Sequence, residues 1–85
     1  MEKRWITTSI VIQEHGEVAV ERIERFFEGD TVVGSGQGIH RHVIEPGDRF
    51  AGENARVRAV CELIHTPEVV SAYRVAAARD AELAR

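Results

Sequence analysis

His40 and His42, two histidines separated by one residue, come nearest in this 85-residue chain to the spacing of a metal site. In an extended strand they point to the same face about 7 Å apart, and two imidazoles so placed can share a zinc ion. A third ligand would have to come from His15, His65 or Cys61, none of which stands at a recognisable spacing from the pair. A small metal- or ligand-binding protein that uses His40 and His42 is therefore one function that the sequence leaves open.

Three glycines at alternate positions, Gly34, Gly36 and Gly38, directly precede the histidines. A dinucleotide-binding loop requires Gly-x-Gly-x-x-Gly at the start of a helix, whereas here the spacing is Gly-x-Gly-x-Gly and a strand is expected to follow. Phosphate binding is therefore rejected. Three glycines in five residues more often mark a loop than a strand. We expect a mobile loop up to about Gly38, with a position inside the third strand as the alternative.

Residues that could perform covalent catalysis are not arranged for it. Ser9, Ser35 and Ser71 have no nucleophile motif around them. Cys61 and His65 stand four residues apart on one expected helix face, but Cys61 belongs to the apolar stripe of that helix and should be a small core residue. We predict that the protein is not an enzyme and uses no cofactor.

Composition narrows the class of protein further. The chain is 44% hydrophobic and 29% charged, which is typical of a soluble globular domain. A net charge of −3 and the alternation of Arg with Glu argue against nucleic-acid binding. The apolar runs fall far short of the ~20 residues that a membrane span needs, and no apolar signal core follows the charged start. We expect a cytoplasmic protein with no membrane partner, and its single cysteine agrees with a reducing compartment.

Periodicity and turn residues predict three strands followed by two helices. β-branched residues mark the strands, turns at Glu14–Glu17 and Glu28–Asp30 separate them, and Glu45-Pro-Gly-Asp48 closes the sheet. Asn54 and Thr66 are the expected N-caps, and Pro67 suits the first position of a helix. The expected ranges are 5–13, 18–27 and 31–44 for the strands and about 54–65 and 67–81 for the helices.

The first strand is expected to place one face in the core. Ile6, Ile10 and Ile12 share one parity, and we assign them to the core. Trp5 and Val11 then lie on the opposite face, with the histidine pair of the third strand near them.

The second strand changes parity along its length. Val18 and Val20 point to one face, whereas Ile23 and Phe27 fall on the other. A β-bulge near Glu21-Arg22 would bring all four to one side, and we expect a bulge there.

Together these elements predict a single α+β domain over residues 1–85. It consists of a three-stranded antiparallel meander covered on one face by a C-terminal two-helix hairpin, because the hairpin is the only apolar cover available. The other sheet face stays poorly covered. If the domain is compact, its radius of gyration should be about 12 Å.

Three segments of the chain, His40–Asp48, Arg56–Cys61 and Thr66–Tyr73, resemble small proteins of tailed-bacteriophage and prophage genomes, which are often encoded near tail or structural genes. The specific parts are the strand that ends in Pro-Gly-Asp and the helix that starts with Thr-Pro-Glu. The resemblance implies a virion-associated or accessory protein that acts by binding other proteins, in the host cytoplasm or in the virion. It brings no catalytic residue with it.

The function predicted from these observations is a non-enzymatic protein–protein interaction module, a phage structural or accessory protein that works as a homo-oligomer or assembly subunit. Sheet edges and an uncovered sheet face invite partners, and Trp and Arg are favoured interface anchors. The predicted interface residues are Trp5, Arg22 and Arg41, together with His40 and His42. An alternative role for Trp5 is a plug that closes one end of the core.

A further alternative is a phage-encoded inhibitor of a host defence enzyme, which would use the same kind of contact surface.

Overall fold

The computed structural model describes residues 1–83, so Ala84 and Arg85 of the predicted domain lie outside the described residues. The strands form one antiparallel sheet in the order β1-β2-β3. The α+β class, a three-stranded antiparallel sheet followed by two C-terminal helices, is confirmed. The elements are β1 (Glu2–Ile12), β2 (Val18–Glu28), β3 (Thr31–Ile44), α1 (Ala55–Ile64) and α2 (Pro67–Leu83).

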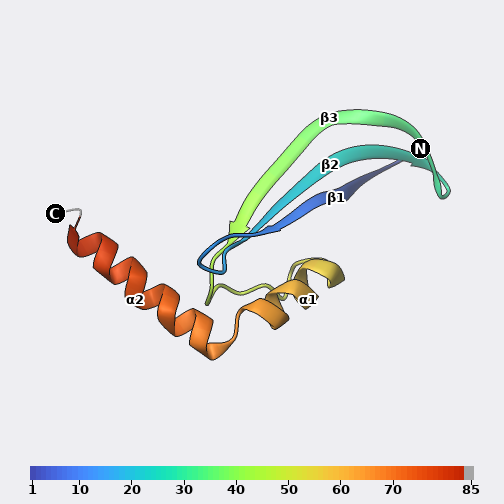
Figure 1. The fold of residues 1–85 in the computed structure, drawn as a ribbon. Helices are drawn as coiled ribbons and strands as arrows, with labels where there is room; N and C mark the ends of the chain where they lie inside the picture. The colour runs from blue at the N-terminus through green and yellow to red at the C-terminus, as the bar shows by residue number, and fades with distance from the viewer. Residues whose placement is uncertain (84–85) are drawn as a thin grey trace.

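The core lies where α1 packs on one end of the sheet. Val57 and Cys61 of α1 are fully buried and contact Val18, Val20 and Ile44 of the sheet. We call the sheet face that α1 covers the inner face and the opposite one the outer face. Figure 1 shows the sheet as a long arch, with α1 below one end of it and α2 projecting away.

The helical cover is a correction to the predicted two-helix hairpin, because α1 supplies it without α2. No residue of α2 is buried. Its first turn does reach the β1–β2 turn, since an added Cβ on Gly16, which has φ +93°, would stand 2.7 Å from Cγ1 of Val69. Beyond Tyr73 the helix offers mainly alanines and charged residues, which bury too little apolar surface to hold it on the sheet.

The molecule is correspondingly extended. Its radius of gyration is 16.4 Å, against about 12 Å for a compact chain of this length. The principal extents are 51 × 27 × 18 Å. Neither of the two described helices combines the length and the apolarity that crossing a bilayer requires.

The β-bulge lies in β1, opposite the position that the sequence predicted on β2. Thr7 pairs with Arg22 and Ser9 with Glu21, which leaves Thr8 as the extra residue. The predicted bulge near Glu21-Arg22 is therefore wrong. Because β2 runs without an insertion, it keeps two apolar faces. Val18 and Val20 lie on the inner face, and Ile23 and Phe27 lie on the outer face.

The bulge also changes which residues of β1 lie on each face of the sheet, because the alternation of side chains shifts by one position at Thr8. Trp5 comes to lie on the inner face with Ile10 and Ile12, whereas Ile6 pairs with Ile23 and lies on the outer face with Val11. The predicted grouping of Ile6 with the other two isoleucines is wrong, because strict alternation fails at an inserted residue.

The glycine run belongs to β3, so the predicted loop up to Gly38 is also wrong. β3 is continuous, and it passes Glu24 with three residues, 36 to 38, between the pairs Ile23↔Ile39 and Arg25↔Ser35. A Cβ on Gly36 would stand 2.5 Å from Oε2 of Glu24. The glycines therefore leave room for a side chain of the neighbouring strand.

Candidate protein-binding surface

Two apolar rows cross the outer face of the sheet from β1 to β3. The isoleucine row consists of Ile6, Ile23 and Ile39, and the valine row consists of Val11, Ala19 and Val43. The ends of the rows are open to solvent, with exposed fractions of 61% for Ile39, 51% for Val11 and 50% for Val43. No described helix covers this face. The rows therefore form a continuous apolar surface of a kind that marks interaction sites.

A polar row separates the two apolar rows. Arg41 donates a hydrogen bond from Nε to Oε2 of Glu21 at 2.9 Å, and the Thr8 hydroxyl donates to Oε1 at 3.1 Å. The hydrogen bond from Arg41, followed by that from Thr8, lowers the pKa of Glu21. The acid and the base neutralise each other, so this row adds no net charge to the apolar surface.

A shallow hollow of about 330 Å³ opens above the valine row. It lies over Ala19, whose methyl group is much smaller than the side chains of Val11 and Val43 on either side. Glu21 and Arg41 also line it. The hollow has the size and lining to accept an apolar side chain with a polar group beside it.

The inner face carries a second cluster, in the part of the sheet beyond α1. The Trp5 and His40 rings meet edge to face with centroids 6.5 Å apart, and the Arg22 guanidinium lies 5.8 Å from the centroid of the Trp5 ring. Arg22 also donates to Nδ1 of His40 at 3.1 Å. His42 stands next to His40, with 5.1 Å between centroids, and its Nε2 lies 2.7 Å from Oε1 of Glu53.

These contacts bear on the metal-site alternative. Both histidines already have protein partners, and the candidate third ligands lie elsewhere. His65 contacts the carbonyl oxygen of Gly16 at 2.7 Å, and Cys61 is in the core. Within residues 1–83, no group of three His, Cys, Asp or Glu side chains could hold a metal ion.

The predicted interface residues are thus divided between the two faces. Trp5, Arg22, His40 and His42 come together on the inner face, and Arg41 lies on the outer face beside Glu21.

The sequence reasoning missed the isoleucine row. The available signal was the opposite parity of Ile23 and Phe27 relative to Val18 and Val20, which we interpreted as a bulge. It indicated instead a strand that is apolar on both faces.

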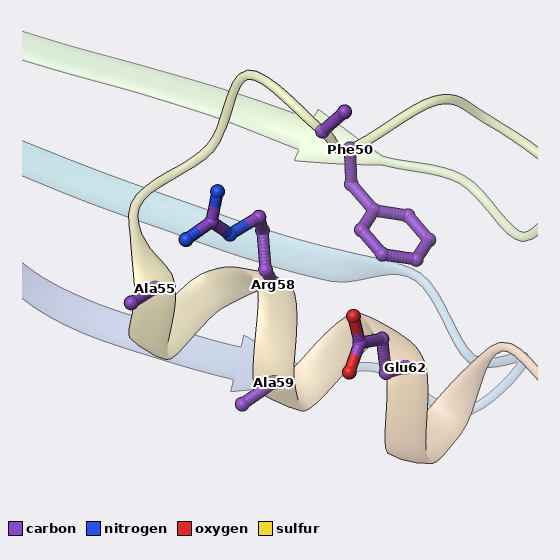
Figure 2. Close-up of a pocket in the computed structure, with 6 residues that line it drawn as sticks. Phe50, Ala55, Arg58, Ala59 and Glu62 are labelled. Atoms are coloured by element: carbon purple, nitrogen blue, oxygen red, sulfur yellow. The ribbon is translucent and has the colours of Figure 1, made fainter.

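A hollow of about 600 Å³ lies on the solvent side of α1 (Figure 2). Figure 2 shows Arg58 and Glu62 on successive turns of α1, with Phe50 of the preceding loop above Glu62. Neither side chain has a nucleophile beside it in the lining of this hollow. Cys61 is turned into the core, where burial raises the pKa of its thiol and so reduces the reactive thiolate.

Comparison with known protein families, with curated proteins and with solved structures gives no match to this chain.

Proposed function

We propose that the protein is a non-enzymatic assembly subunit that associates with further copies of itself through its open sheet. The observation that carries the proposal is the exposed apolar surface formed by the isoleucine and valine rows. On the opposite face, α1 buries only one end of the sheet against Val57 and Cys61.

The balance of buried and exposed apolar residues supports self-association. Among the described residues, twelve large hydrophobic side chains are exposed, whereas six hydrophobic residues form the buried core. Single exposed hydrophobics are ordinary on protein surfaces, but contiguous ones mark contacts with other molecules. Four of the twelve, Ile6, Val11, Ile39 and Val43, lie in the two rows across the outer face, so a partner could cover several of them at once.

The resemblance to tailed-phage proteins favours an assembly of a phage particle, or of its accessory factors, as the setting for this subunit. In such an assembly a small subunit contributes surface and needs no site for a small molecule. The inhibitor alternative would use the same surface against a different protein.

A native mass spectrum of the untagged protein, recorded with and without a chelator, tests the proposed function. We expect a metal-free oligomer whose mass does not change with chelator. A monomer at every concentration would overturn the proposal. A species that loses the mass of a metal ion with chelator would instead support the alternative based on His40 and His42.

A further inference from the structure

We propose that β1 pairs antiparallel with β1 of a second copy, which joins two sheets into one sheet of six strands. This inference rests on the proposed self-association and assigns it to the edge of the sheet, where the apolar rows of two copies meet. It starts from the edge of the sheet that β1 forms, where the backbone has no strand neighbour among residues 1–83.

The edge formed by β1 has few of the features that usually protect sheet edges, because its charged residues are confined to Glu2, Lys3 and Arg4 and its one irregularity is the bulge at Thr8. Residues 5–12 include no charged residue, proline or glycine, although natural edge strands carry such residues to prevent pairing with other chains. The other edge, β3, is a poorer template, because it contains Gly34, Gly36 and Gly38 and pairs irregularly with β2 at two places.

One register of this pairing matches the faces of β1. When Trp5 stands opposite Ile12 of the second copy, Ile6 stands opposite Val11. The bulge at Thr8 places Trp5 and Ile12 on the inner face and Ile6 and Val11 on the outer face. Each pair therefore has both side chains on one face, which antiparallel pairing requires.

The same register covers the exposed apolar side chains of β1. Trp5 and Ile6 are 43% and 36% exposed, and Val11 and Ile12 are both 51% exposed. These are the large hydrophobics that β1 leaves open, and all four become partners of one another. Aromatic and β-branched residues are favourable cross-strand pairs.

The pairing also joins the apolar rows of the two copies. The isoleucine row of one copy ends at Ile6, directly opposite Val11, where the valine row of the second copy begins. A single apolar row then runs across all six strands. The valine row of the first copy joins the isoleucine row of the second copy in the same way, which gives a second continuous row. Lys3, near the start of β1, comes opposite Glu14, which follows β1 of the second copy, so the charges at this position are complementary.

The β1 edge is accessible for such a partner. A hollow of about 220 Å³ runs beside residues 7–10, with Arg56 of α1 at its wall. Among the hydrogen bonds from α1 and its N-cap, one reaches β1, from Asn54 Nδ2 to the side-chain oxygen of Thr7 at 2.7 Å. That bond engages a side chain and leaves the strand backbone free to pair.

A set of three double variants tests the register by sedimentation velocity. Ile6→Lys with Val11→Lys places two like-charged pairs directly across the interface and should raise the dimer dissociation constant roughly tenfold or more. Ile6→Lys with Val11→Glu creates opposite charges at the same positions and should restore the dimer. Ile39→Lys with Val43→Lys alters the same two rows at the β3 edge and should leave the dimer intact.

The outcomes separate the two proposals. If the lysine pairs at the β1 and β3 edges weaken association equally, or if neither pair does, pairing through β1 is wrong and self-association through another surface still stands. A wild-type protein that is always a monomer overturns both.

Disulfide trapping gives a second test that does not depend on dissociation. Directly opposed residues have Cβ atoms about 4.5–5.5 Å apart, so a small approach of the strands brings them to the roughly 3.5–4.5 Å of a disulfide and oxidation can link them. A mixture of Ile6→Cys and Val11→Cys proteins should form a cross-linked heterodimer faster than a mixture of Ile6→Cys and Val43→Cys. Equal yields in both mixtures would overturn the register. The native Cys61 is buried and its pKa is raised, so it should react slowly.

Discussion

The backbone N–H of Gly38 donates a hydrogen bond to Oε2 of Glu24 across 2.9 Å, between the edge and the centre of the sheet. The other carboxylate oxygen of Glu24 lies 3.0 Å from Nζ of Lys3 on the opposite edge strand. Glu24 therefore links all three strands at the point where residues 36 to 38 of β3 pass it. Trp5 packs beside it, since a Cβ on Gly38 would stand 2.8 Å from Cη2 of Trp5.

Adding a methyl group at Gly36 should disrupt this arrangement. The new Cβ would stand 2.7 Å from Cβ of Glu24, an atom that cannot move away without moving β2. We expect Gly36→Ala to lower the free energy of unfolding by about 1–3 kcal/mol, as overpacking usually does, measured by urea denaturation. Gly52→Ala is the matched control, because its Cβ would meet nothing within 4 Å. Equal stability of the two variants would show that β3 does not lie close to Glu24.

The interactions of the Glu24 carboxylate with Lys3 and Gly38 should make the stability of the protein depend on pH in the acid range. The ion pair with Lys3, followed by the hydrogen bond from Gly38, lowers the pKa of Glu24 from its ordinary value of 4.5. The ionised carboxylate of Glu24 therefore stabilises the fold fully above the ordinary pKa. This contribution is lost as the pH falls through the lowered pKa of the folded state.

We expect Glu24→Gln to reduce the fall in melting temperature between about pH 5 and pH 3. Lys3→Met, which removes the largest cause of the shift, should act in the same direction. Glu21 also has a lowered pKa, so part of the acid dependence should persist in both variants. Melting curves of the two variants that follow the wild-type curve at every pH would contradict the role of Glu24.

The core should depend on α1 and hardly on α2. Val57 is fully buried against the sheet, so Val57→Ala should cost about 2 kcal/mol of unfolding free energy. Val75 on α2 is 58% exposed, and Val75→Ala should change stability by less than about 0.5 kcal/mol. A comparable loss in both variants would mean that α2 also packs on the sheet. Thermal or urea unfolding, followed by circular dichroism, measures the difference.

Metal ions should leave the protein unchanged. His40 Nδ1 accepts from Arg22 and His42 Nε2 is paired with Glu53, and among residues 1–83 no third side chain completes a ligand set with them. We expect equal melting temperatures with zinc and with chelator. A zinc-dependent rise that disappears when His40 and His42 are both replaced by Ala would revive the metal-site alternative.

Local signals in the sequence predicted the elements well. Asn54 caps α1 as expected, with Oδ1 accepting the N–H of Val57 at 2.9 Å, and the Thr66 hydroxyl accepts the N–H of Val69 at the start of α2. Caps and helix-starting prolines act within a few residues, so the sequence alone can indicate them.

The features that the sequence did not predict depend on neighbouring strands. The glycines of β3 are explained by Glu24 on β2, and the faces of β1 depend on the extra residue Thr8. Nothing local to either strand specifies those contacts. The position of α2 was missed for a related reason, because its alanines allow close packing without providing enough apolar area to require it.

The most direct test of the central claim is a sedimentation velocity series on the wild-type protein, from micromolar to near-millimolar concentration. Self-association through the sheet predicts a sedimentation coefficient that rises with concentration toward that of a dimer, because mass action favours the associated state. A coefficient that stays at the value of a single extended chain throughout the series would contradict it.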